Sequence, residues 1–179
     1  MDYRMIERCR AGDATAVEHF VQTYQRDVYR LALSILDDSH EAEDATQESL
    51  LAALRALDSF HGDSSLKTWL VSITVNVCRT RLQRQKRREQ LKQVLNVIFQ
   101  RTSALTVEED AIRNESNRAL WSAIHKMDEK HRIPIVLRYY HDLSVPEIAS
   151  ILQIPEGTVH SRLNTARRLL HDVLKEGSL

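Results

Sequence analysis

Residues 144–170 constrain the fold most, because they predict two short helices joined by a tight turn. Ser144 and Glu147 have the spacing of a capping box, in which each side chain binds a backbone N–H group at the start of a helix. Pro146 suits the first turn of that helix. Residues 153–155 interrupt the periodicity, and an apolar stripe of a second helix follows. The stretch is typical of a helix-turn-helix.

The second helix of this stretch has two different faces. Its inward stripe is Val159, Leu163, Ala166 and Leu170. Its outer face is polar and basic and carries His160, Ser161, Arg162, Asn164, Thr165, Arg167 and Arg168. Such a face fits the DNA major groove, where polar side chains reach base edges and guanidinium groups hold phosphates. An ordinary helical hairpin with a solvated basic face is the alternative that these residues leave open.

Glycine and proline are scarce, which argues against an all-β fold because such a fold needs many turns. The chain has four glycines and three prolines among 179 residues. Its periodic segments are long and rich in Ala, Leu, Glu, Arg and Gln, which favour helices. The hydrophobic fraction of 42% is enough for packed cores. We therefore predict an all-α chain of one large or two small domains.

Opposite charges are separated along the chain, although the net charge is zero. Residues 37–48 contain six acidic residues and no Lys or Arg, whereas residues 79–92 contain seven basic residues against Glu89 alone. This separation predicts two surfaces for two different partners. The alternative is that the two tracts form neighbouring helices whose charges pair with each other.

Several classes of protein are excluded by what the sequence lacks. Cys9 and Cys78 are too few and too far apart for a zinc site, and the scattered histidines form no convincing metal-ligand pair. We expect no metal, no cofactor and reduced cysteines, as in cytosolic proteins. No signal peptide or apolar run of membrane length is visible, which predicts a soluble cytoplasmic protein without membrane insertion.

Periodicity predicts the remaining helices. In the first half we expect helices over 2–11, over 13–36 with Asp13 as N-cap, over 41–57 preceded by Ser39 or His40, from Leu66 to beyond Arg88 with Ser65 as cap, and a short one over 91–99. Residues 101–110 lose the periodicity and read as a linker. Helical pattern resumes near Ile112, and Asp128 is expected to cap a helix to Tyr140 that Pro134 kinks.

These signals together resemble one family, the bacterial RNA polymerase sigma factors of the extracytoplasmic-function type. The matching features are the run EAEDATQESLLAAL (41–54), the pattern F-x-G-x-S-S-x-x-T-W-L from Phe60 to Leu70, Asn76 with its basic tract, and the C-terminal helix-turn-helix. The resemblance covers nearly the whole chain in the expected order. It implies a region 2 domain over 1–91, a linker over 92–111 and a region 4 domain over 112–179.

The acidic helix is expected to bind the polymerase. Asp44, Gln47 and Glu48 are spaced i, i+3 and i+4, so they share one face, and a clustered acidic face suits a basic partner. The resemblance implies that this face binds the β′ clamp helices of core RNA polymerase. A merely solvated helix face is the alternative.

The loop and the start of the next helix are expected to hold the melted −10 element. The resemblance implies polar contacts to an extruded base or its phosphates from Ser59, His61, Asp63, Ser64, Ser65, Lys67 and Asn76. Trp69 lies on a stripe with Ile73 and Val77, which favours a core position over a stacking surface. Leu66 stands where the family often has Phe, so aromatic stacking is not expected there.

Two basic sets are expected on duplex DNA. The tract of Arg79, Arg81, Arg84, Lys86, Arg87 and Arg88 suits phosphates, as do Arg167 and Arg168. The last helix would read the −35 element through His160, Ser161, Arg162, Asn164 and Thr165. Gln153 replaces the glycine often found in such turns and is expected to strain the turn without abolishing it.

The resemblance thus implies a promoter-specificity subunit without catalytic activity. Its partners would be core RNA polymerase (β′ clamp helices and β subunit), promoter DNA and an anti-sigma factor. One alternative is a helix-turn-helix regulator that binds duplex DNA without polymerase. Another is an enzyme using the carboxylates of residues 41–48 as metal ligands, which the lack of a His or Asp pair on another helix disfavours. Composition does not decide whether the two domains pack together in an inactive state.

Overall fold

The structure is a computed structural model that describes residues 3–99 and 115–176. Every regular element in these ranges is helical, which confirms the all-α prediction. The elements are α1 (Tyr3–Arg10), α2 (Ala14–Leu36), α3 (Ser39–Ala56), the 3₁₀ turn η1 (Leu57–Ser59), α4 (Leu66–Phe99), α5 (Glu115–His125), α6 (Glu129–Tyr139), α7 (Val145–Leu152) and α8 (Glu156–Glu176).

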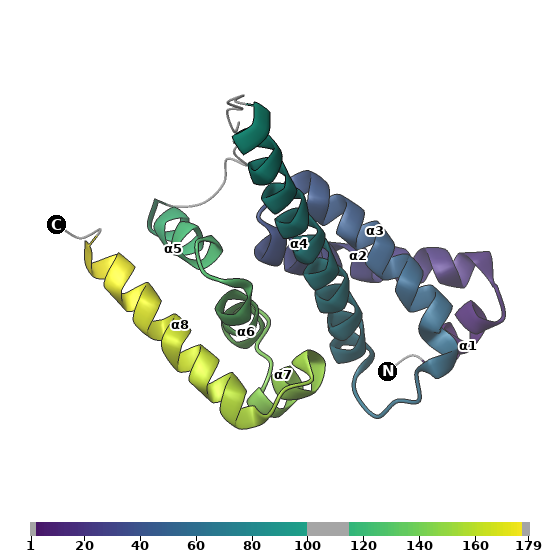
Figure 1. The fold of residues 1–179 in the computed structure, drawn as a ribbon. Helices are drawn as coiled ribbons and strands as arrows, with labels where there is room; N and C mark the ends of the chain where they lie inside the picture. Colours follow the sequence, from purple (N-terminus) through teal and green to yellow (C-terminus); the bar gives the residue numbers. More distant parts are fainter. Residues whose placement is uncertain (1–2, 100–114, 177–179) are drawn as a thin grey trace.

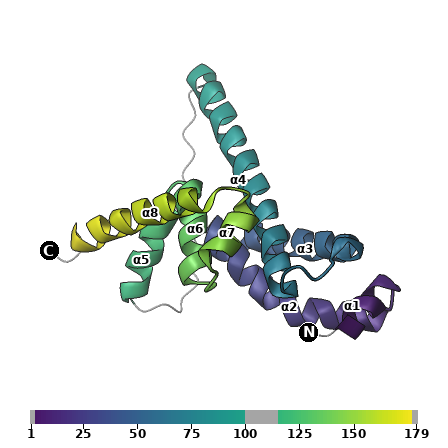
Figure 2. The ribbon, with the colours of Figure 1, turned by 90° about the horizontal axis from the view of Figure 1, so that it is seen from below.

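The first domain is a bundle in which α2, α3 and α4 pack together and α1 covers one end (Figure 1). α2 turns its predicted stripe inward, and Phe20, Leu31 and Ile35 are almost completely buried. α3 meets α2 through small side chains such as Ala42 and Ala45, which let the two backbones approach closely. The far end of α4 extends beyond the bundle (Figures 1 and 2).

The second domain contains α5 to α8, and the predicted helix-turn-helix is confirmed as α7 and α8. The capping box is present, since the Ser144 backbone donates to Glu147 Oε2 at 2.9 Å and the Glu147 backbone donates to Ser144 Oγ at 3.4 Å. Gln153 occupies the turn in the left-handed region with φ of 54°, so the turn forms without glycine, as expected. Val159 and Leu163 are buried beneath it.

Two helix predictions were wrong. α3 begins at Ser39 and not at Glu41, so Ser39 and His40 lie inside the helix. Its N-cap is Asp38, whose carboxylate accepts a bond from the Glu41 backbone at 2.8 Å. Residues 91–99 do not form a separate helix, because α4 continues through them. The reason is local, since no Gly or Pro interrupts the chain there. The predicted linker at 101–110 lies outside the described residues, and the domain boundaries remain predictions.

The two domains pack against each other, which composition alone did not decide. α2 contacts α6, and α4 contacts α7. Figure 1 shows α6 and α7 beside α4. Buried side chains of both domains join one apolar cluster, in which Val71 and Val75 of α4 belong together with Leu137 and Ile148.

Candidate polymerase and nucleic-acid interfaces

The predicted polymerase-binding residues share one outward face of α3. Asp44 and Gln47 are exposed, and Glu48 is half-exposed. The same helix buries Ala45 and Ser49 on its opposite side. The side chains of this face therefore point away from the core of the first domain.

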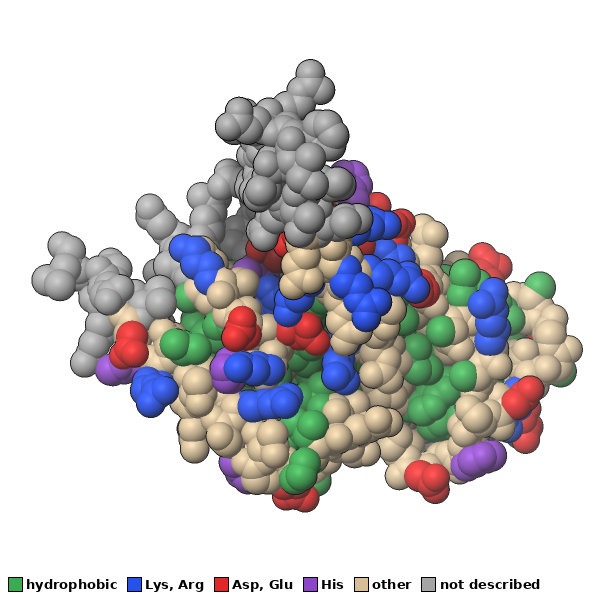
Figure 3. Space-filling view, viewed as in Figure 1, with side chains coloured by type: hydrophobic (Ala, Val, Ile, Leu, Met, Phe, Trp, Pro, Cys, Tyr) green, Lys and Arg blue, Asp and Glu red, His purple; other side chains and the backbone are tan. Residues whose placement is uncertain are grey.

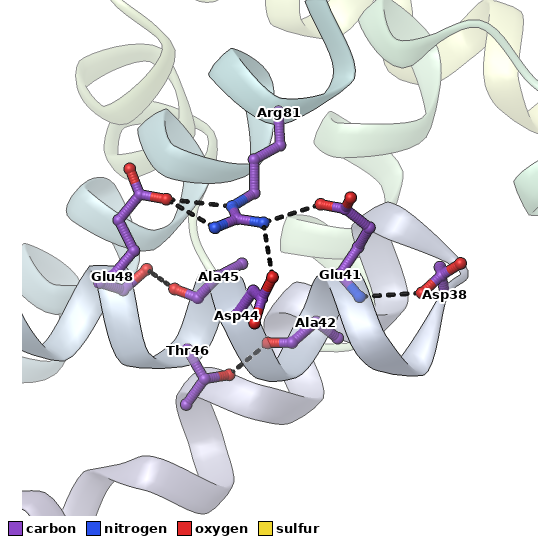
Figure 4. Close-up of polar contacts among 9 residues, drawn as sticks. Asp38, Glu41, Ala42, Asp44, Ala45, Thr46, Glu48 and Arg81 are labelled. Carbon is purple, nitrogen blue, oxygen red and sulfur yellow. Dashed lines mark hydrogen bonds and ion pairs between the residues drawn. The ribbon is translucent and has the colours of Figure 1, made fainter. Parts of the chain in front are cut away.

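Arg81 of α4 lies over this acidic face (Figure 4). Its guanidinium lies 2.8 Å from Glu41 Oε2, 3.6 Å from Asp44 Oδ2 and 2.9 Å from Glu48 Oε2. A bond from Nε to the same Glu48 oxygen, at 3.1 Å, makes the contact with Glu48 two-pronged. The Arg81 side chain is only 18% exposed. Arg81 was predicted to bind DNA phosphates, but its guanidinium points at α3, so here the acidic and basic tracts do pair.

Local hydrogen bonds fix both ends of the loop before α4. Ser65 Oγ accepts a bond from the Thr68 backbone at 3.0 Å, which confirms Ser65 as the cap of α4. Ser59 Oγ donates to the Ala56 carbonyl at 2.7 Å. His61, Asp63 and Ser64 are exposed, as is Lys67 on the first turn of α4. The predicted −10 residues before α4 therefore form one exposed polar rim.

Two aromatic rings anchor this loop. Phe60 is buried, and its ring centroid lies 5.2 Å from that of Trp69. Trp69 is half-buried against the core, which agrees with its predicted core position. The ring pair fixes the entry of the loop into α4, so that its polar side chains face outward.

Arg10 also positions this loop, and the sequence analysis did not find it. Its guanidinium donates to the Leu57 carbonyl and to the Phe60 carbonyl, each at 2.7 Å. It thereby ties α1 to the backbone between α3 and α4. No motif marks Arg10, because its partners are backbone atoms about fifty residues away.

The remaining basic residues of α4 lie mostly in solvent. Arg84, Arg87 and Arg88 are exposed, and so is Asn76 one turn before the tract. Arg79 and Lys86 instead reach the second domain, where each lies 3.6 Å from a carboxylate oxygen of Glu129 on α6. Figure 3 shows Lys and Arg side chains interleaved with acidic ones on the face where the domains meet.

α8 presents the predicted recognition surface. The exposed members of this surface are His160, Ser161, Asn164, Arg167 and Arg168, while Arg162 and Thr165 are half-buried. Arg167 donates to Asn164 Oδ1 at 2.9 Å, which holds both side chains along the helix. All seven residues therefore lie on or beside one face that is opposite to the buried stripe, as a helix that enters a groove requires.

A histidine lies half-buried at the domain contact. His141, which follows α6, lines a small cavity together with residues of α2 and α4. Burial, together with the charge of Lys67, lowers the pKa of His141 to about 4, while the carboxylates of Asp27 and Asp142 oppose this shift. Its Nε2 atom is buried without a hydrogen-bond partner among the described residues. His141 is therefore neutral in the folded protein near neutral pH.

We expect His141→Gln to make the fold less sensitive to acid. The pKa of His141 is about 4 in the folded chain against an ordinary value of 6.5, so the unfolded chain binds more protons between these values. Stability is full above pH 6.5 and falls as the pH drops toward 4, by roughly 1 kcal/mol at pH 5.5. Urea unfolding above pH 6.5 and at pH 5.5 measures this loss of stability. The loss should be smaller in His141→Gln.

The control for this prediction is His61→Gln, because His61 is exposed on the loop before α4. This variant should keep the acid sensitivity of the wild type. Equal acid sensitivity in the His141 and His61 variants would contradict the role given to His141.

The described residues offer no metal site. No group of three or more His, Cys, Asp or Glu side chains among them is placed to hold a metal ion. Glu41 and Glu48, which a metal-dependent enzyme with ligands at residues 41–48 would use, contact Arg81 instead. Among the helices of the same described residues, none is long and apolar enough to cross a membrane.

Comparison with known proteins identifies both domains. The family model Sigma-70 region 2 matches residues 20–88, and Sigma-70, region 4 matches residues 117–170. The chain is similar to the ECF RNA polymerase sigma factor SigW of Bacillus subtilis, with 32% identity over 97% of this chain and 96% of that protein.

Two solved structures share the fold. One is the sigma factor RpoE in complex with the anti-sigma factor NepR from Bartonella quintana, with a TM-score of 0.71 and 23% identity over 88% of this chain and 96% of that one. The other is CnrH in complex with the cytosolic domain of CnrY, with a TM-score of 0.66 and 25% identity over 98% and 97%. Family models and relatives agree, and the chain belongs to the extracytoplasmic-function sigma factors of bacterial RNA polymerase.

Proposed function

We propose that this chain binds core RNA polymerase through the acidic face of α3 and directs it to promoters. The observation that carries this proposal is the shared outward face of Asp44 and Gln47, which are exposed, and Glu48, which is half-exposed, on a helix whose other side is buried. A clustered acidic face steers and orients a basic partner surface. The β′ clamp helices and the β subunit of the polymerase are the proposed partners.

The −10 and −35 contacts are assigned to different domains. The exposed rim before α4, with Lys67 and Asn76, would hold melted −10 bases and their phosphates. The outer face of α8 would read the −35 element, with Arg162 and Asn164 near base edges and Arg167 and Arg168 on phosphates. Arg84, Arg87 and Arg88 would hold duplex phosphates beside the −10 element.

This role needs binding energy and no covalent chemistry, so we propose that the chain is not an enzyme. It would act in the cytoplasm, where the polymerase transcribes. We also propose restraint by an anti-sigma factor. The supporting observation is that both similar structures hold a bound partner: the sigma factor RpoE is bound to the anti-sigma factor NepR, and CnrH is bound to the cytosolic domain of CnrY.

The test is run-off transcription with purified core polymerase on a promoter library, with core polymerase alone as the control. Specific initiation that depends on the added chain supports the proposal. Binding of duplex DNA by the free chain is measured in parallel. Tight sequence-specific binding without polymerase, together with no initiation, would favour a stand-alone regulator and overturn the proposal.

A further inference from the structure

A single carboxylate of the second domain holds two cations of the first. Glu129 Oε1 lies 3.6 Å from Arg79 Nε, and Glu129 Oε2 lies 3.6 Å from Lys86 Nζ. The Glu129 side chain is only 16% exposed, so it lies inside the domain contact and not at its edge. The three side chains border a cleft of about 350 Å³ between the domains.

The same contact involves two other groups assigned to promoter DNA. Lys67, whose side chain is still exposed, lies in the wall of a cavity that His141 of the second domain also lines. Next to it, Thr68 Oγ1 donates to Glu147 Oε1 of α7 at 3.3 Å, so the first turn of α4 meets the first turn of the helix-turn-helix. Arg162 of the recognition helix borders the same cleft as Glu129 and is half-buried.

The Glu129 contact is chemically equivalent to a phosphate contact. A carboxylate and a DNA phosphate both offer anionic oxygens to guanidinium and ammonium groups, so Glu129 competes with a phosphate for Arg79 and Lys86. We propose that Glu129 occupies the position of a DNA phosphate on Arg79 and Lys86, which keeps the free chain in a closed, autoinhibited state. This inference rests on the proposed function, and it adds Arg79 and Lys86, which the sequence analysis expected on phosphates, to the DNA-binding residues of α4.

The strength of these pairs fits a reversible latch. Exposed ion pairs stabilise little, and Arg79 and Lys86 are 38% and 59% exposed. Polymerase that binds the two domains at a fixed spacing favours the open state and releases both cations. The closed state therefore lowers the affinity of the free chain for DNA without blocking the complete complex.

The test compares Glu129→Gln with Asp128→Asn in the full chain. Asp128 is the neighbouring carboxylate, but it pairs with Lys130 of its own domain at 3.8 Å and is 73% exposed. Each substitution removes one negative charge, so the two variants have the same net charge. Glu129→Gln is expected to raise the affinity of the free chain for labelled fork-junction DNA about fivefold, the equivalent of two exposed ion pairs. Asp128→Asn is expected to leave it nearly unchanged. Small-angle scattering should show a larger radius of gyration for Glu129→Gln only.

Run-off transcription at saturating core polymerase separates this inference from the proposed function. Wild type and Glu129→Gln should initiate equally, because the polymerase holds the domains open. If the wild type does not initiate, the proposed function is wrong. If it initiates, but Glu129→Gln matches Asp128→Asn in both DNA affinity and radius of gyration, the latch is wrong.

Discussion

Replacement of Asp44 by arginine is expected to abolish binding to core RNA polymerase and leave the fold intact. The Asp44 side chain is 67% exposed and makes the longest of the three contacts to Arg81, at 3.6 Å. Glu41 and Glu48 still hold Arg81 in the variant, so the contact between α3 and α4 remains. Reversal of one charge at the centre of an acidic interface should weaken binding roughly hundredfold or more. Competition with wild type for core polymerase measures the loss, and thermal unfolding checks the fold.

Glu18→Arg is the matched control for this prediction. Glu18 is exposed on α2 and does not belong to the α3 face. It makes the same change of net charge, so it removes any general effect of added positive charge. The assignment of the α3 face is wrong if the Asp44 variant competes as well as the Glu18 variant does.

Local features were predictable from sequence because their partners are three or four residues apart. The capping box of Ser144 and Glu147 is one example, and the buried stripe that includes Val159 and Leu163 is another. Helical geometry fixes which of these side chains share a face, whatever the rest of the chain does. The open outer face of α8 follows from the same geometry, and so does the shared face of Asp44, Gln47 and Glu48.

The contacts between distant segments were not predictable in this way. Arg81 and Glu48 are 33 residues apart, and Thr68 and Glu147 are 79 residues apart. Such pairs depend on how the helices pack and in which register, and no short pattern encodes that. The prediction of where α3 begins was wrong for a different reason. Asp38 and Ser39 are both good caps, so the start of α3 depends on where the left-handed residue Asp37 ends α2.

Arg81→Met is expected to lower the free energy of unfolding by about 2 kcal/mol, since hydrogen bonds to charged groups contribute this much. Methionine keeps the apolar contacts of the arginine stem but leaves three carboxylates of α3 without their common cation. The repulsion among those carboxylates adds to the loss. Urea unfolding measures the effect. Arg84→Met is the control, because Arg84 is exposed one turn further along α4, and it should change stability by less than about 0.5 kcal/mol.

The same two variants separate the two roles considered for the basic tract. If Arg84 binds a phosphate, its loss should reduce the salt dependence of promoter binding by the polymerase complex by about one counterion. Arg81 is held by α3, so Arg81→Met should leave that salt dependence unchanged even though it destabilises the fold. The opposite pattern, a stable Arg81→Met protein with reduced salt dependence, would show that Arg81 leaves its carboxylates to bind DNA. It would also mean that polymerase binding to α3 and release of Arg81 are coupled, because both involve Glu41, Asp44 and Glu48.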